Sequence, residues 1–289
     1  MEDHFSAAWV CIIGLGLMGG SLGMALRASR ACRRVTAVAR QNSTCDLATM
    51  MGAVDQATTD ALPAVGRADI VVLATPVRTI VRQISILGPH MAPGALLIDM
   101  GSTKAEIVSE MERLPEHVQA IGGHPMCGKE RAGIAVAEAT LYQGKVFCLT
   151  PLRRTNARSL ALAHELVRAV GARPLVIDSQ RHDALVAVTS HLPYLMAAAL
   201  TATAAQSAAA DPLTWQLAAS GFRDTSRLAG SDVDMMLDIL LTNRGNVAAG
   251  AQQAAQRLLD LATAIETGDE DTLRSTLTDT QHAWREVYR

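Results

Sequence analysis

The chain has 289 residues, of which 49% are hydrophobic, and its 26 Lys and Arg against 28 Asp and Glu leave a net charge of −2. A chain of this length and hydrophobic content is not disordered and folds into about two domains. The balance of charge excludes a basic surface over the whole molecule, so nucleic acid is not an expected partner.

Five cysteines, an odd number without a CxxC pair, indicate free thiols in a reducing compartment and no metal site. The acidic first residues lack the basic-then-apolar order of a signal peptide, so we expect a cytoplasmic protein. Residues 184–213 carry one charge, Asp211, yet their many Ser, Thr, Gln and Ala side chains are too polar to favour lipid. We expect this stretch to be a helix buried inside protein, without membrane contact.

Short apolar runs alternate with helical patterns over residues 1–178. Seven runs predict strands, at 9–13, 35–39, 70–74, 95–99, 118–121, 146–149 and 174–177. Strands without a polar face are typical of a mostly parallel sheet that is covered by helices on both sides. Residues 1–178 are therefore expected to form one α/β domain.

After Asp178 the pattern changes to long helix-forming stretches, such as 250–267 and 269–287, without a convincing strand. Gly268 and Asp269, which separate these two stretches, are typical of a helix end followed by an N-cap. Residues 179–289 are therefore expected to form an all-α domain. Its richness in Ala and Leu favours a homodimer formed through this domain.

A glycine-rich turn follows the first strand directly and opens a helix. Its G-x-G-x-x-G pattern lets the chain turn tightly, lets backbone approach a pyrophosphate, and lets the helix pack closely on the strand. The N-terminus of that helix favours the phosphate charge. The pattern predicts a Rossmann-type, doubly wound domain that binds a dinucleotide through Gly14, Gly16, Leu17, Met18 and Gly19.

The end of the second strand indicates which dinucleotide binds. An NAD site places Asp or Glu there, about 20 residues after the turn, but this strand ends without an acid. Arg40, Ser43 and Thr44 offer a charge and hydroxyls to a 2′-phosphate, so NADP is favoured, while NAD stays open. Alternatively, Arg40 is solvated and Thr44 caps the next helix. Thr75 and Pro76, after the third clear strand, are further candidates for dinucleotide binding.

Two further segments follow neighbouring strands at the carboxyl edge of the sheet, where ligands bind in open α/β folds. The segment D-M-G-S-T-K places Ser102 there, and G-G-H-P-M-C-G places His124. Either His124 faces a substrate or it is a loop histidine that bonds to backbone.

Polar groups also interrupt the apolar helical half. The segment S-H-L-P contains His191, and Arg223 and Arg227 are four residues apart, so they share one face if this stretch is helical. Two guanidinium groups on one face suit a carboxylate. Alternatively, they pair with nearby acids, namely Asp224, Asp232 or Asp234.

Together these motifs, in this order, resemble the prephenate/arogenate dehydrogenase family, with the NADP-dependent arogenate branch most similar. The resemblance runs from residue 9 to about residue 250. It implies that His124 accepts a hydrogen bond from the ring hydroxyl of the substrate, assisted by Ser102, and that Arg227 binds a substrate carboxylate. It also implies that His191 supports the pocket and that Glu130 faces the substrate side chain.

These roles imply oxidative decarboxylation of a cyclohexadienol, arogenate or prephenate, with hydride transfer to NADP, on the route to tyrosine. A neutral His124 pulls on the hydroxyl proton, and turnover is expected to fall as it protonates, near its usual pKa of about 6.5. Glu130 favours the ammonium of arogenate over the keto acid of prephenate, unless Lys129 and Arg131 reverse that field.

The sequence departs from many family members where they carry a Pro and a Trp, because Val233 and Met236 stand at those positions. Other two-domain reductases remain alternatives: the imine reductases, and the β-hydroxyacid dehydrogenases, which the absence of lysine from the helical half disfavours. A non-catalytic, dinucleotide-sensing protein is the alternative from another class. Such a protein has no reason to keep His124, Ser102 and Arg227 together.

Overall fold

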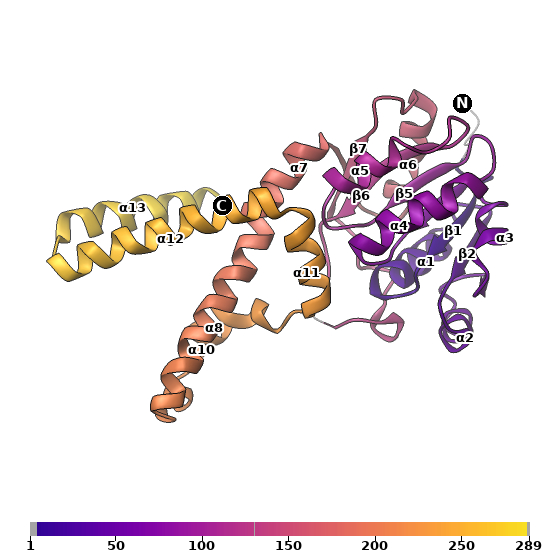
Figure 1. Cartoon of the computed structure of the whole chain (residues 1–289). Helices are drawn as coiled ribbons and strands as arrows, with labels where there is room; N and C mark the ends of the chain where they lie inside the picture. Colours follow the sequence, from indigo (N-terminus) through magenta and orange to yellow (C-terminus); the bar gives the residue numbers. More distant parts are fainter. Residues whose placement is uncertain (1–4, 130, 288–289) are drawn as a thin grey trace.

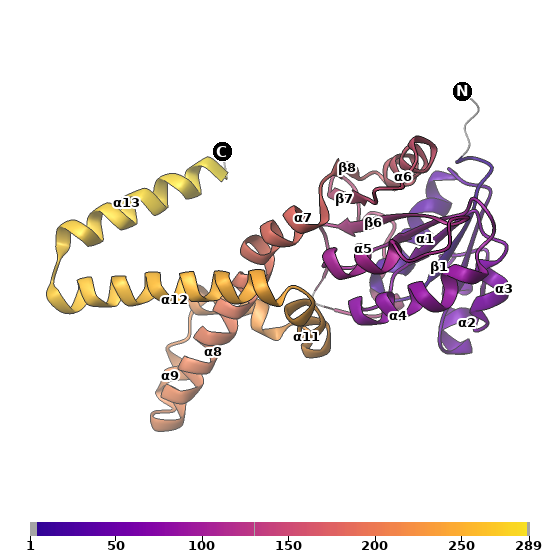
Figure 2. The same cartoon turned by 45° about the horizontal axis from the view of Figure 1, so that its top comes forward.

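The computed structural model describes residues 5–129 and 131–287 (Figure 1). The N-terminal half forms a sheet enclosed by helices, and the C-terminal half forms an arm of long helices that projects from one side of it. Figure 2 shows the last two helices as a hairpin that extends away from the sheet.

The sheet has eight strands among the described residues, in the order β3-β2-β1-β4-β5-β6-β7-β8. They are β1 (Trp9–Ile13), β2 (Arg34–Val38), β3 (Gln56–Thr58), β4 (Ile70–Leu73), β5 (Leu96–Asp99), β6 (Gln119–Pro125), β7 (Val146–Pro151) and β8 (Arg173–Val176). Neighbours are parallel except β6 and β7, so β7 and β8 run against the rest. The expected mostly parallel sheet is confirmed.

Helices cover both faces of the sheet and complete two cores. On one face lie α1 (Leu17–Ser29), α2 (Asn42–Met50) and α6 (Ala157–Ala169), and on the other α3 (Ala61–Val65), α4 (Val77–Leu87) and α5 (Ala105–Met111). Two short 3-10 helices, η1 (Gly88–His90) and η2 (Ile134–Val136), lie in the connections. In the central strands β1, β4 and β5 successive side chains enter opposite cores, which explains why these strands are predominantly apolar.

Two strands differ from the expectation. The edge strand β3 is polar and its side chains are mostly exposed, so it has no hydrophobic signal. Strand β6 does not end at residue 121 but continues to Pro125, and it pairs with β7 so that His124 lies opposite Cys148. His124 is therefore held on a strand rather than in a loop.

The C-terminal half has no strand among its described residues, which confirms its all-α character. It comprises α7 (Ser179–Val186), the π-helix η3 (Ala187–His191), α8 (Leu192–Ala210), α9 (Leu213–Gln216), α10 (Ser220–Ser226), the 3-10 helix η4 (Arg227–Gly230), α11 (Val233–Thr242), α12 (Arg244–Thr267) and α13 (Glu270–Val287). Gly268 ends α12 with φ +67°, and Asp269 accepts the N–H of Thr272 at the start of α13.

One helical segment, Ser179–Ala210, is long and apolar enough to cross a membrane, since an 18-residue window within it has a mean hydropathy of 1.5. Only 22% of this window is buried by the rest of the chain. The expectation that this stretch is buried inside protein is therefore wrong for the single chain. Exposed apolar side chains are spread over the whole helical half and are not confined to this segment; they include Leu213, Leu217, Val233, Leu258, Leu259, Ile265 and Leu277. One such segment is weak evidence for a membrane, and the exposed apolar side chains on other helices show that this exposure is not special to it.

Candidate active site

The glycine-rich turn has the geometry that a pyrophosphate requires. Gly14 has φ +104°, a left-handed conformation that favours glycine, and a Cβ on Gly19 would lie 1.9 Å from the carbonyl oxygen of Gly14. A Cβ on Gly16 would meet none of the described atoms within 4 Å, so backbone is open to a ligand on this side. None of the described side chains caps α1, so its first N–H groups can bind an anion. These residues fit a dinucleotide.

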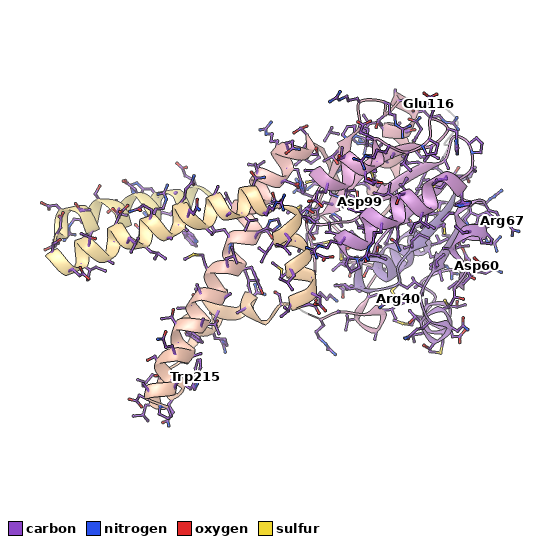
Figure 3. The ribbon with its side chains drawn as sticks, viewed as in Figure 1. Arg40, Asp60, Arg67, Asp99, Glu116 and Trp215 are labelled. Atoms are coloured by element: carbon purple, nitrogen blue, oxygen red, sulfur yellow. The ribbon has the colours of Figure 1, made fainter. Side chains whose placement is uncertain are left out.

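The residues expected to choose between NADP and NAD follow β2. Arg40 is exposed at the edge of the sheet domain (Figure 3), and Ser43 and Thr44 lie in the first turn of α2. The N-cap of α2 is Gln41, so Thr44 does not cap this helix. That leaves the Thr44 hydroxyl without a capping role.

A long connection between β6 and β7 packs over the glycine-rich turn. The hydroxyl of Tyr142, which is fully buried, donates to the carbonyl oxygen of Met18 at 2.6 Å. On the opposite side, the methyl group of Thr75 lies against Gly14, and Pro76 immediately precedes α4. The turn is thus held between β4 and a connection that begins just after His124.

His124 is the first of three side chains joined by hydrogen bonds. Its Nδ1 atom lies 2.8 Å from Nε2 of His182, and Nδ1 of His182 lies 2.8 Å from Oδ1 of Asp183. His182 and Asp183 are buried and belong to α7, whereas His124 is half-buried at the end of β6. The three side chains therefore span the junction between the sheet and the helical half.

This arrangement determines where the ring protons lie. An ionised Asp183 can only accept, so His182 donates from Nδ1 and, when neutral, accepts at Nε2. His124 therefore donates from Nδ1 to His182, and the lone pair on its Nε2 is left to accept a proton. The three residues are suited to present His124 as a general base.

The surroundings keep His124 neutral. Burial lowers the pKa of His124 well below its ordinary value, and electrostatic repulsion of its protonated form by His182, Lys104 and His191 lowers it further. Burial also lowers the pKa of His191 to about 4, although the charge of Asp183 opposes that shift. The fall in turnover expected near pH 6.5 is therefore displaced to lower pH.

Asp183 also joins the two halves of the chain through backbone. Its carboxylate accepts the N–H of Lys104 at 2.7 Å and the N–H of Ala105 at 2.8 Å, and so caps α5. The amide of Asn243 donates to the carbonyl oxygen of Asp183 at 2.8 Å and to Nδ1 of His191 at 3.3 Å. Because Nδ1 of His191 accepts, the neutral ring carries its proton on Nε2 and can donate there.

The position of His191 follows from a local interruption of the α-helical hydrogen-bond pattern. Pro193 has no N–H for the α-helical bond to residue 189, and the turn that precedes it is the π-helix η3. His191 is the last residue of this turn and is buried. The extra residue in the turn changes the direction in which the side chain leaves the helix.

The remaining candidates lie around this centre or outside it. Ser102 is half-buried in the turn between β5 and α5, and Arg227 begins η4, which packs against α8. Arg223 is 79% exposed and its Nε lies 3.5 Å from Asp224, which matches the alternative of pairing with a nearby acid. Its helix contacts Trp215, which lies at the far end of the arm in Figure 3. Glu130 lies outside the described residues.

Sequence reasoning missed three members of the centre: His182, Asp183 and Asn243. The first two stand in a short polar stretch after Asp178, which is typical of an exposed helix. The one feature of the sequence that could have indicated them is a histidine followed directly by an acid, His182 and Asp183, near the start of the helical half. None of the described residues forms a cluster of three or more side chains that could hold a metal ion.

Comparison with known proteins agrees with this geometry. The family model for the nucleotide-binding domain of prephenate dehydrogenase matches residues 22–176, and the model for its dimerization domain matches residues 178–279. The chain is 29% identical to prephenate dehydrogenase of Bacillus subtilis over 266 residues, which are 91% of this chain and 72% of that protein.

Solved structures give the same result over almost the full length. Prephenate dehydrogenase of A. aeolicus, in complex with hydroxyphenyl propionate and NAD+, is 30% identical, with a TM-score of 0.90 over 98% of this chain and 99% of that one. Arogenate dehydrogenase of Synechocystis is 32% identical, with a TM-score of 0.83 over 97% of this chain and 100% of that one. The chain is thus an oxidoreductase whose cofactor is a nicotinamide dinucleotide, and it belongs to the prephenate dehydrogenase family.

Proposed function

We propose that this protein oxidatively decarboxylates arogenate, with prephenate as an alternative substrate, and that it uses NADP. The observation that carries the proposal is the chain of hydrogen bonds from Asp183 through His182 to His124, which ends in a nitrogen lone pair. A cyclohexadienol has a hydroxyl on C4 and a carboxylate on C1 across the ring. Its oxidation takes hydride from C4 and releases carbon dioxide from C1, so that the ring becomes aromatic. The hydroxyl proton is taken up by a base during the reaction and returns to the phenolate oxygen of the product.

In this reaction His124 accepts the hydroxyl proton at Nε2. As charge develops on its ring, His182 accepts a stronger hydrogen bond, and Asp183 stabilises the charge through His182. A bound nicotinamide dinucleotide supplies the hydride acceptor. General-base assistance of this kind contributes about 10²–10⁴-fold to the rate.

Two further side chains complete the proposed centre. Ser102 stands at the carboxyl edge of β5, beside the strand that carries His124, and assists at the substrate hydroxyl. His191 donates from Nε2, because Asn243 occupies its Nδ1. A neutral donor suits a negatively charged substrate without adding a second base beside His124.

The preference for arogenate rests on charge near the substrate side chain. The ammonium of Lys129 lies 2.8 Å from the Glu138 carboxylate and donates to the Val136 carbonyl oxygen. Its charge is therefore largely balanced, which removes one of the two cations that would oppose Glu130. A carboxylate at Glu130 then favours the ammonium of arogenate over the keto group of prephenate.

The preference for NADP rests on Arg40, which stands exposed after β2 where an NAD site would carry an acid. A guanidinium group binds a 2′-phosphate through charge-assisted hydrogen bonds. The hydroxyls of Ser43 and Thr44, in the next helical turn, add donors to the same place.

The exposed apolar side chains of the helical half support a homodimer. They are distributed over the chain from α7 to α13, and the described residues of this chain leave them uncovered, for example Leu217 at 81% and Ile265 at 66% exposure. Residues 179–289 are proposed as the domain that dimerises, with the boundary at 178. Such a dimer, in the cytoplasm, would cover the apolar segment Ser179–Ala210 without a membrane.

The variant His124→Asn tests the function. It keeps the dinucleotide turn intact, so dinucleotide binding followed by nucleotide fluorescence is expected to be unchanged. Release of carbon dioxide from arogenate is expected to fall by at least about 10²-fold, because the general base is lost. A variant that retained full turnover would contradict the role of His124 and with it the proposed chemistry.

A further inference from the structure

A buried ion pair lies directly behind the candidate catalytic residues. Asp99 ends β5 on the side of the sheet domain that faces the helical arm (Figure 3), and the ammonium of Lys104 donates to its carboxylate. Both side chains are 0% exposed. Removing such charges from water costs several kcal/mol per ion, and apolar residues of similar volume are often more stable. Stability alone therefore does not account for this pair.

The pair forms hydrogen bonds with backbone groups next to both candidate catalytic residues. The Asp99 carboxylate accepts the N–H of Gly101 at 2.7 Å and the N–H of Gly123 at 2.9 Å. Lys104 Nζ donates to the carbonyl oxygen of Gly123 at 2.6 Å. Gly101 directly precedes Ser102, and the Gly123 carbonyl belongs to the peptide group that enters His124. One ion pair thus holds the backbone that immediately precedes both residues.

These hydrogen bonds require glycine at positions 101 and 123. A Cβ on Gly123 would lie 2.3 Å from the carbonyl oxygen of Asp99, and a Cβ on Gly101 would lie 2.6 Å from Ile107 Cδ1. No larger residue fits at either position without moving backbone or core. The close approach of the ion pair to two peptide segments is therefore built into the sequence.

We propose that the Asp99–Lys104 ion pair positions the catalytic site: it fixes the spacing between Ser102 and His124 and keeps a cation beside the His124 imidazole. Lys104 and Asp99 act through their neighbours and touch no reacting atom. The kinetic part of this inference rests on the proposed function, because it assumes that His124 is the base.

The effects of Lys104 and of Asp99 on the protonation of His124 can be distinguished by experiment. Among the described residues, the ionisable groups near His124 are Lys104, Asp99, His182, Asp183, His191 and Cys148. Removing the Lys104 ammonium leaves the Asp99 carboxylate unbalanced, which favours protonated His124. Removing the Asp99 charge leaves the cation unbalanced and disfavours protonated His124. If the ion pair had only a structural role, the two changes would not shift the protonation of His124 in opposite directions.

The experiment compares Lys104→Met, Asp99→Asn and the double variant, which removes both charges at similar volume. Titration of 13C-labelled histidine by NMR measures the midpoint of His124, whose resonance is identified by its loss in His124→Asn. The control is Arg154→Met: Arg154 also donates to four backbone carbonyls, at the opposite end of β6. Dinucleotide binding and kcat with arogenate are measured on each variant.

We expect Lys104→Met to raise the His124 midpoint by about 1 unit, a usual effect of one nearby charge, and to lower kcat at least about tenfold through misplacement. Asp99→Asn is expected not to raise the midpoint. The double variant is expected to fold and to lose kcat while still binding dinucleotide.

The proposal is overturned if Lys104→Met leaves the midpoint unmoved, or if both single variants raise it equally. It is also overturned if the double variant loses no more kcat than Arg154→Met. Absence of turnover in the unmodified chain would refute the proposed function instead. The NMR titration would then still decide whether the ion pair controls the charge of His124.

Discussion

Replacing Asp183 with Asn tests the hydrogen-bond chain at the point farthest from the substrate. The Asp183 carboxylate accepts three hydrogen bonds, from His182 Nδ1 and from the N–H groups of Lys104 and Ala105, at 2.7–2.8 Å. An amide has one accepting oxygen, so at least one donor is left facing an NH2 group. At about 1.5–3 kcal/mol for each bond to a charged group, the free energy of unfolding should fall by about 2–4 kcal/mol.

The same change should cost more in catalysis than in binding. Without an anion, His182 loses the partner that fixes its tautomer, so His124 is presented less often with a free Nε2. The comparable loss in serine proteases is about 10⁴-fold. We expect kcat with arogenate to fall by about 10³-fold, or about 4 kcal/mol of barrier, with little change in the dissociation constant of the dinucleotide.

The assay is steady-state formation of reduced nicotinamide, with folding checked by circular dichroism and denaturation. The matched control is Asp178→Ala, because Asp178 caps the same helix through the N–H groups of Gln180 and Arg181. It should cost about 1 kcal/mol of stability and leave kcat unchanged. A folded Asp183→Asn variant with kcat within tenfold of the unmodified protein would refute the reasoning.

Three further outcomes are expected. Arg40→Asp should move the ratio of kcat/KM for NADP over NAD toward NAD by at least about tenfold, because an acid repels the 2′-phosphate; an unchanged ratio would contradict the assignment. Arg227→Ala should mainly raise KM for arogenate, since it removes a charged bond to a carboxylate, and an unchanged KM would argue against that contact. The folded pKa of His191 is about 4, below its unfolded value of about 6.5, so its contribution to stability is complete above pH 6.5. That contribution, on the order of 3 kcal/mol, is lost as pH falls to about 4, and denaturation of His191→Gln should show a smaller loss.

Much of the sheet domain could be predicted because its signals are local. A glycine-rich turn between an apolar strand and a helix needs no distant partner to be recognised. The edge strand β3 could not be predicted in this way, because Gln56–Thr58 is short and polar and has a partner on one side only. Likewise, the extension of β6 to Pro125 depends on pairing with β7, which begins only at Val146.

The centre of the site was harder to predict because it joins distant segments. His124 stood out beside Gly122 and Gly123, but its partner His182 is 58 residues away on a helix of surface-like composition. The burial of His182 and Asp183 appears when α7 meets α5. Lys104 was visible in its motif, yet its contact with the peptide before His124 depends on the packing of β5 against β6.

The central claim is that this chain oxidises a cyclohexadienol by means of His124. Its most direct test is the rate of reduced-nicotinamide formation by the purified chain with arogenate and with prephenate, each offered NADP and NAD. We expect turnover in at least one mixture, fastest with arogenate and NADP, and its loss in His124→Asn. Bound dinucleotide without turnover in any of the four mixtures would contradict it.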